Sequence, residues 1–311
     1  MNHAVHTAPQ ATGHLILKSI ETPELQPHEA QVQVEHISIN RGEAFVAQFA
    51  PEGLQLGWDF SGKVVEAAAD GSGPKAGTRV MGLLPMGAWA RFLAVPALQL
   101  CEVPESISLQ QAAALPVAGL TAHFSLQKAG NLQQKKVLVT GATGGVGHLA
   151  VQLAHLGGAE VTAQIRNPEQ ALWVEQLGAT HVLTGDPASW AESGPFDVIV
   201  DGVGGEGFAV LPALLARDGM LICYGASAGN PVQLNLMPFT MTGGLSLQGI
   251  ALFQELQRED PATVLAFLIQ QVAAEKLKVR IEKEASWTEM GSVAEDLLAR
   301  KFSGKAILKV E

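Results

Sequence analysis

Apolar and polar residues alternate along much of the first hundred positions, in short runs separated by glycine and proline. The clearest run covers residues 31–35, and residues 62–66, 78–81 and 90–95 follow the same pattern. Alternation with a period of two is typical of strands that bury one face. Residues 14–105 are therefore predicted to be mostly β structure.

The pattern changes near residue 108. Ser108 with Gln111 forms a capping box that predicts the start of a helix, and Pro116 interrupts that helix. A second helix is expected over residues 119–128. Strands and helices then alternate over residues 136–252, which is typical of an α/β domain.

The C-terminal part returns to a strand after two helices. Asp260 followed by Pro261 is a helix N-cap with proline at the first helical position, and another helix is expected over residues 290–300. Residues 305–310 predict a terminal strand, which needs a sheet to join. The β-rich N-terminal part is its natural partner.

Both ends of the chain are therefore predicted to build one β-rich domain, with an α/β domain inserted between them. The predicted boundaries assign residues 1–115 and 254–311 to the β-rich domain and residues 116–253 to the inserted one. A chain of 311 residues is long enough for two ordinary domains.

Residues 137–154 are the most informative stretch of the chain. An apolar run at 137–139 predicts a buried strand, a glycine-rich turn follows from Gly141 to Gly147, and apolar residues then recur at helical spacing. Glycines allow the backbone to approach a pyrophosphate, and the N–H groups at a helix start favour its negative charge. The stretch therefore predicts a dinucleotide-binding turn.

The glycine pattern alone is a weak signal, because Ala142 takes the first position of G-x-G-x-x-G. Its context strengthens it. Strands are predicted at residues 160–165, 181–183 and 196–201, with a helix that ends near Gly178. This β-α-β-α-β order is the layout of a Rossmann half, a doubly wound parallel sheet. The alternative is a doubly wound domain whose glycines only permit tight packing.

The end of the second predicted strand bears on the choice of nucleotide. An NAD site usually ends this strand with an acid that binds the ribose 2′-hydroxyl, whereas residues 163–167 contain none. Arg166 can instead pair with a 2′-phosphate through its planar guanidinium. NADPH is therefore the expected cofactor. The alternative is that Arg166 is an ordinary surface arginine.

Composition excludes several classes of protein. With 47% hydrophobic and 16% charged residues the chain is not disordered, and a net charge of −10 without a basic cluster argues against nucleic acid. Two cysteines far apart suit a reducing compartment. The N-terminal residues, with His3 and His6, are expected to form a mobile tail and do not resemble a signal peptide. No apolar run of membrane-spanning length occurs, so a soluble, cytoplasmic protein is expected.

With these motifs placed, the chain resembles the medium-chain dehydrogenase/reductase superfamily, and within it the zinc-free quinone oxidoreductases. The resemblance covers nearly the whole chain. Its motifs lie at residues 38–40, 57–64, 77–82, 87–92, 112–122, 141–147, 201–205, 224–225 and 304–305. It implies a Rossmann domain inserted in a GroES-like β-rich domain, and NADPH-dependent reduction. It also implies a homodimer whose sheets pair along an edge strand, here residues 245–249.

The chain departs from the zinc-dependent members of that superfamily. They have cysteine where Asn40 stands and Gly-His-Glu where Gly57, Trp58 and Asp59 stand. The four-cysteine structural zinc lobe is also absent. Zinc sites need three or four Cys, His or carboxylate ligands, so no metal site is predicted.

The resemblance also assigns roles to residues. Asn40 is expected beside the nicotinamide, where its amide N–H would serve the oxyanion that develops on the acceptor; the alternative is a turn residue at a strand end. The expected cofactor-binding residues are Thr121, Gly144, Gly145, Val146, Arg166, Gly204 and Gly225. For Thr121 the alternative is a helix residue that satisfies the backbone.

Aromatic side chains suit a flat acceptor. Phe45, Trp58, Trp89 and Phe253 are therefore candidates for the acceptor pocket, with ordinary core positions as the alternative for Trp58 and Phe253. No side-chain proton donor is assigned. Glu43 and Asp59 are acids near these residues in sequence, but nothing in the sequence marks them as catalytic.

Without a metal, an acceptor that is already electrophilic is the simplest partner for a hydride. The expected partner is thus a small electrophilic molecule, with a quinone as the first choice. Two alternatives remain open at this stage. One is an enone or enoyl reductase that saturates an activated carbon–carbon double bond, and the other is a non-catalytic NADPH-binding sensor.

Overall fold

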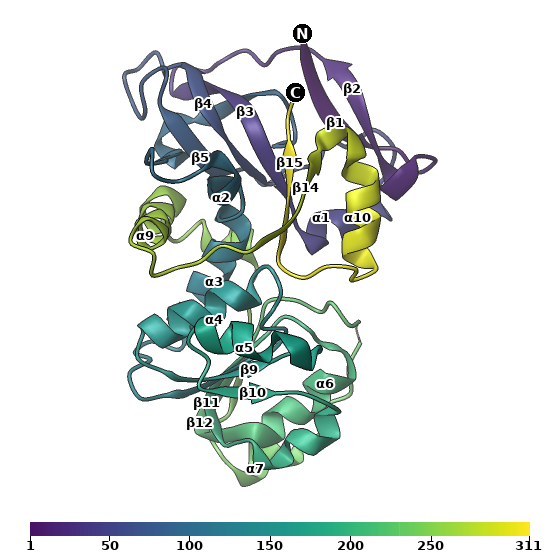
Figure 1. Ribbon diagram of the computed structural model, residues 1–311, viewed down its shortest axis with the longest axis vertical. Helices are drawn as coiled ribbons and strands as arrows, with labels where there is room; N and C mark the ends of the chain where they lie inside the picture. The colour runs from purple at the N-terminus through teal and green to yellow at the C-terminus, as the bar shows by residue number, and fades with distance from the viewer. Residues whose placement is uncertain (230) are drawn as a thin grey trace. The chain divides into compact units, whose positions relative to one another are not determined.

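The computed structural model describes residues 1–229 and 231–311. The chain divides into two compact units (Figure 1). Unit 1 comprises Met1–Leu120, Leu256–Glu275 and Val279–Glu311, and unit 2 comprises Thr121–Glu255 and Lys276–Lys278. Unit 1 is thus built from both ends of the chain. The change from unit 1 to unit 2 falls inside α3 (Pro116–Lys128).

Unit 1 is built on a seven-stranded sheet with the order β14-β15-β3-β4-β5-β7, in which β6 also pairs with β3. The strands are β3 (Glu29–Ile39), β4 (Asp59–Glu66), β5 (Arg79–Leu83), β6 (Phe92–Pro96), β7 (Cys101–Glu102), β14 (Ile281–Ser286) and β15 (Lys305–Lys309). The C-terminal strand β15 pairs antiparallel with β3, so the terminal strand joins the N-terminal β-rich part, as predicted.

Two segments of unit 1 differ from their predictions. The expected mobile N-terminal tail is instead β1 (Asn2–Thr7), paired antiparallel with β2 (Leu15–Ile20). The residues after Asn40 form the helix α1 (Arg41–Ala47), within a stretch that was predicted to be mostly β structure. The other helices of unit 1 are α2 (Leu109–Ala113), α9 (Pro261–Ala273), α10 (Met290–Leu298) and the 3-10 helices η1 (Thr12–His14), η2 (Ala97–Gln99) and η6 (Trp287–Glu289).

Unit 2 is a six-stranded parallel sheet with the order β10-β9-β8-β11-β12-β13. Its strands are β8 (Lys136–Val139), β9 (Glu160–Gln164), β10 (His181–Leu183), β11 (Phe196–Asp201), β12 (Leu215–Cys223) and β13 (Ser246–Gly249). Its helices are α4 (Gly147–Leu156), α5 (Ala171–Gln176), α6 (Gly205–Val210), α7 (Met237–Met241), α8 (Leu252–Glu255) and the 3-10 helices η3 (Pro168–Gln170), η4 (Pro187–Glu192) and η5 (Leu211–Leu214). This is the predicted doubly wound fold.

Local sequence signals explain where several helices begin. The Ser108 hydroxyl accepts a hydrogen bond from the Gln111 N–H and starts α2, and the Asp260 carboxylate accepts from the Ala262 and Thr263 N–H groups and starts α9. A cap of this kind contributes about 1 kcal/mol. Apolar burial contributes far more, because each fully enclosed large side chain adds about 1.5–3 kcal/mol. Phe60 in unit 1 and Leu138 in unit 2 are examples.

Candidate functional site

The carboxyl edge of the unit 2 sheet is where a doubly wound fold binds its ligand. From β8 the chain runs outward through β9 and β10, and it then returns to the other side of β8 at β11. The crevice at such a reversal, beyond the ends of the strands, is the usual ligand position. The glycine turn after β8 and the segment after β11 both lie there.

Backbone geometry shows why the turn after β8 needs glycine. Gly141 has a φ of +58°, a conformation that side chains disfavour. A Cβ on Gly147 would lie 2.2 Å from the Gly141 carbonyl oxygen, and a Cβ on Gly144 would lie 3.2 Å from it. The Gly144 N–H donates to that same oxygen at 2.9 Å. The turn is therefore a tight cradle that only bare backbone can form.

The last residue of β9 holds the same turn in place. The Gly141 N–H donates to Oε1 of Gln164 at 3.0 Å, and the Ala142 N–H donates to the Gln164 carbonyl oxygen at 2.9 Å. The sequence analysis did not single out Gln164. The only indication in the sequence is an amide side chain at the end of a strand next to a glycine turn. The sequence does not tell in which direction the Gln164 side chain points.

Backbone donors at the start of α4 fit a phosphate group. Among residues 1–229 and 231–311, the N–H groups of Gly145 and Val146 have no hydrogen-bond partner. They precede the ten-residue α4, whose dipole places partial positive charge at this end. The free N–H groups of Gly145 and Val146 at this helix start are donors of the kind that suit an anion such as a pyrophosphate, whereas the Gly144 N–H is bonded to Gly141.

Asp201 links the ends of β8 and β11. Its carboxylate accepts the Thr140 hydroxyl at 2.5 Å and the Gly204 N–H at 2.9 Å. The residue is only 1% exposed, and this burial raises its pKa above the ordinary aspartate value. Asp201 therefore fixes the glycine loop after β11, a role that the motif around it did not reveal.

The segment after β12 packs directly against that loop. A Cβ on Gly202 would lie 2.2 Å from the Tyr224 ring, and one on Gly225 would lie 3.1 Å from the Gly202 carbonyl oxygen. Gly204 has a φ of +65°, and a Cβ there would lie 2.9 Å from the Cα of Ala226. The predicted residues Gly204 and Gly225 therefore allow two loops to meet at the carboxyl edge.

The remaining predicted residues of unit 2 lie in different surroundings. Arg166 is exposed just beyond the end of β9, a position open to a 2′-phosphate. Thr121 is 7% exposed inside α3, and its carbonyl accepts the Ser125 hydroxyl, as an ordinary helix residue would. Phe253 is half-buried in α8.

In unit 1, Asn40 lies between the end of β3 and the start of α1, within a cluster that we call the Asn40 cluster. Its members are Asn40, Glu43, Asp59 and Lys305. The Asn40 Nδ2 donates to Oε2 of Glu43 at 3.0 Å and to Oδ2 of Asp59 at 2.7 Å. The Lys305 Nζ donates to Oδ1 of Asn40 at 2.6 Å and to Oδ2 of Asp59 at 3.3 Å.

These contacts fix the amide orientation of Asn40. Lysine can only donate and ionised carboxylates only accept, so the amide oxygen must face Lys305. Both amide hydrogens are then engaged with the two acids. The predicted donation of this N–H to an oxyanion is therefore not available in the arrangement seen here. Asn40 does lie at a strand end, which was the alternative interpretation.

The two acids of the Asn40 cluster also bind backbone. Glu43 accepts the Asn40 N–H at 2.8 Å and the Trp58 N–H at 2.6 Å, and Asp59 accepts the Val117 N–H at 2.7 Å. Glu43 is 1% exposed, and its burial, followed by the negative charge of Asp59, raises its pKa to about 8. The sequence shows both acids near Asn40 but not that they orient its amide, because the fold and not the spacing brings Lys305 to them.

The three predicted aromatic residues of unit 1 differ in exposure. Phe45 is 58% exposed on α1 and its ring contacts that of Phe49, with centroids 5.0 Å apart and the ring planes tilted by 57°. Trp58 is half-buried beneath Gly42. Trp89 is fully enclosed in the core and its indole N–H donates to the Ser38 carbonyl oxygen at 3.2 Å. Trp89 therefore offers no surface to an acceptor, and the prediction of a pocket wall there fails.

Comparison with protein families agrees with this architecture. Residues 26–105 match the alcohol dehydrogenase GroES-like domain, and residues 145–270 match the zinc-binding dehydrogenase family. A putative quinone oxidoreductase, YhfP, from Bacillus subtilis (strain 168) is 28% identical, with 94% of each chain covered. The chain belongs to the medium-chain dehydrogenase/reductase superfamily. Within it, the chain is quinone oxidoreductase-like, as the motifs predicted.

Further relatives of this quinone oxidoreductase-like chain extend the comparison. Quinone oxidoreductase-like protein 2 from Bos taurus is 29% identical over 96% of the chain and 89% of its own length. The solved structure of mycobacterial Rv1454c complexed with NADPH is 25% identical, covers 99% of this chain and all of its own, and has a TM-score of 0.89. CurK enoyl reductase, at 22% identity and a TM-score of 0.87, shares the fold.

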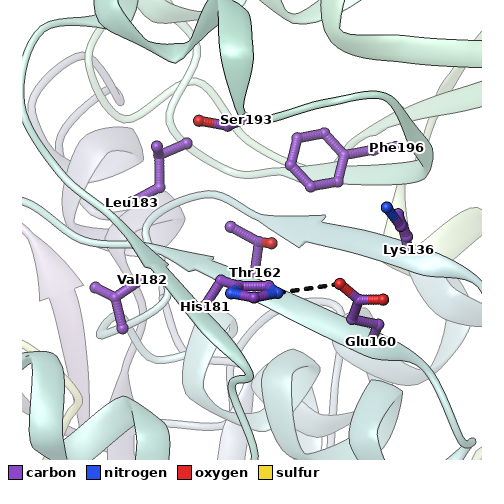
Figure 2. Close-up of a pocket in the computed structure, with 8 residues that line it drawn as sticks. All are labelled: Lys136, Glu160, Thr162, His181, Val182, Leu183, Ser193 and Phe196. Atoms are coloured by element: carbon purple, nitrogen blue, oxygen red, sulfur yellow. Dashed lines mark hydrogen bonds and ion pairs between the residues drawn. The ribbon is translucent and has the colours of Figure 1, made fainter.

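A cavity elsewhere in the quinone oxidoreductase-like chain is unrelated to this site. It measures about 290 Å³, and Figure 2 shows the residues that line it, which come from β8, β9, the whole of β10, the start of β11 and the segment before β11. Its lining residues are Lys136, Glu160, Thr162, His181, Val182, Leu183, Ser193 and Phe196. No predicted site residue is among them.

The described part of the quinone oxidoreductase-like chain contains neither a metal-binding cluster nor a membrane-spanning helix. Within residues 1–229 and 231–311, no group of three or more His, Cys, Asp or Glu side chains is arranged to hold a metal ion. In that same part of the chain, no helix has the length and apolar character that a membrane span requires.

Proposed function

We propose that this NADPH-dependent oxidoreductase transfers a hydride to a quinone without zinc. The observation that supports the cofactor assignment is the cradle after β8, where tightly packed glycine backbone leads into the unpaired N–H groups of Gly145 and Val146. Asn40 and Trp58 stand where zinc-dependent relatives have metal ligands, which supports zinc independence.

NADPH supplies the hydride when it is bound. In our proposal the backbone around Gly144 and Val146 holds its pyrophosphate, Arg166 pairs with its 2′-phosphate, and the loops fixed by Asp201 wall the cofactor. The acceptor is held against Phe45 and Trp58, and Asn40 is the polar group beside it. Rate enhancement then rests on ring positioning and on hydrogen bonds to the developing oxyanion.

A saturating reduction of an activated carbon–carbon double bond is the second candidate. The same cradle and the same unit 1 residues serve it, and the fold is shared with CurK enoyl reductase. Pocket shape decides between the two acceptors.

A homodimer in a reducing compartment such as the cytoplasm completes the proposal. β13 ends the unit 2 sheet, so its outer edge is open for pairing with a second copy. Leu247 on β13 is 44% exposed, and Met241 at the end of α7 is 75% exposed. Cys101 and Cys223 are free thiols, as a reducing compartment allows.

The test is NADPH oxidation, followed by absorbance, against a panel of quinones and α,β-unsaturated carbonyl compounds. A chelator is present, and NADH is run in parallel. Turnover with quinones that survives the chelator and prefers NADPH supports the proposal. Turnover only with unsaturated carbonyls selects the second candidate. Tight NADPH binding with no turnover on the panel would favour a non-catalytic sensor.

A further inference from the structure

The charges of the Asn40 cluster do not balance. Glu43, Asp59 and Lys305 are at most 2% exposed, so water screens them little. With all three ionised, two negative charges face one positive charge. Burying an unpaired charge is costly, and the usual response of a protein is to bind or release a proton. The cluster therefore has a place for one additional proton.

The hydrogen bonds indicate where this proton goes. Asp59 lies 3.3 Å from the Lys305 ammonium and accepts the Val117 N–H at 2.7 Å. Among the described residues, Glu43 has no hydrogen bond or ion pair with the Lys305 ammonium and accepts hydrogen bonds from neutral N–H groups. The groups that face Glu43 from neighbouring elements are the Trp58 N–H just before β4, Asp59 on β4 and, farther away, Lys305 on β15.

Protonation of Glu43 changes what Asn40 can donate. Oε2 of Glu43 now accepts two N–H groups, from the Asn40 backbone at 2.8 Å and from Nδ2 at 3.0 Å. A protonated carboxyl oxygen has less acceptor capacity and cannot hold both. The longer contact, to Nδ2, is the one to break. One amide hydrogen of Asn40 then becomes available while Lys305 and Asp59 keep the amide oriented.

We propose that Glu43 is a positioning residue whose proton uptake frees an amide N–H of Asn40 for the oxyanion of the acceptor. The proposal rests on the proposed function only in placing Asn40 beside the acceptor. Its covalent balance is simple, since one proton moves from solvent to Oε2 of Glu43 and no electron is transferred. The raised pKa of Glu43, about 8, means that the proton is bound at neutral pH.

The first test is the pH profile of kcat between pH 6 and 10, with the best acceptor and saturating NADPH. We expect kcat to fall about tenfold per pH unit above about pH 8, as for loss of one essential proton. In Glu43→Gln, a neutral isostere with no titrating carboxyl, the alkaline fall of kcat should disappear. Asp59→Asn should move the fall to lower pH, because it removes the charge that raises the pKa of Glu43.

The matched control is Glu35→Gln, which makes the same change at a partly exposed acid on β3. It should leave the profile unchanged. An alkaline fall that persists in Glu43→Gln overturns the proposal. So does a Glu43→Gln variant of normal stability that loses the same fraction of kcat at every pH, because that outcome indicates a purely structural role.

A second readout does not depend on turnover. The side-chain amide signals of Asn40 in the ¹⁵N NMR spectrum of the full chain, assigned by their loss in Asn40→Ser, should titrate with the Glu43 carboxyl. If no acceptor is reduced, the proposed function fails while this titration still tests the cluster. A flat titration of the Asn40 amide in the unmodified chain overturns the inference, even where Glu43→Gln does not fold.

Discussion

Replacement of Gly147 by alanine tests the cradle most directly. The added Cβ would lie 2.2 Å from the Gly141 carbonyl oxygen. Carbon–oxygen contacts normally begin near 3.3 Å, so the turn must open by roughly 1 Å. That displacement misaligns the N–H groups of Gly145 and Val146. Hydrogen bonds to a charged group contribute about 1.5–3 kcal/mol each, so weakening of one or two predicts NADPH affinity about ten- to several-hundred-fold lower.

The assay is titration of the fluorescence of bound NADPH, with unfolding by denaturant measured in parallel. Overpacking alone costs about 1–3 kcal/mol of stability, so both numbers are needed. Gly144→Ala, whose Cβ would lie 3.2 Å from the same oxygen, should show a smaller loss. Gly249→Ala, with open space around it, is the control and should bind normally. Normal NADPH binding by Gly147→Ala would refute the assignment of this turn to the pyrophosphate.

Three further changes test other parts of the structure. Arg166→Ala should weaken NADPH binding about tenfold or more and leave NADH unchanged, since a phosphate pair contributes about 1.5–3 kcal/mol; equal loss for both nucleotides in titrations would contradict this. Stability should fall as pH rises from 4.5 to about 8, because the folded state keeps the Glu43 proton that the unfolded chain releases. Denaturation at several pH values should show a shallower slope for Glu43→Gln, and an unchanged slope would exclude Glu43 as the source. Leu247→Lys should give a monomer by light scattering, and a surviving dimer would place the interface elsewhere.

Local signals made much of unit 2 predictable. Its strands are short apolar runs, and the glycine turn between β8 and α4 has few other structural uses. The caps at Ser108 and Asp260 also gave correct helix starts, since each depends only on residues within one turn. In unit 1, the assignment of the terminal strand to the N-terminal sheet followed from the need of that strand for a partner.

The Asn40 cluster shows where sequence reasoning stopped. Lys305 lies 265 positions from Asn40, so nothing local connects them, and the saturation of the amide depends on that contact. The helix α1 was missed because it is only seven residues long and contains Gly42, a poor helix former. Trp89 was assigned to a pocket because the sequence does not distinguish an aromatic residue in a core from one that lines a binding pocket.

The pairing of β15 with β3 has a consequence for the order of folding during synthesis. Every strand of unit 2 has left the ribosome before β15 is made, whereas unit 1 lacks both a central strand and the Lys305 ammonium until that moment. Domains generally fold as units as they emerge. The inserted unit is therefore expected to fold first. Until β15 is made, the two acids beside Asn40 have no cation to neutralise them.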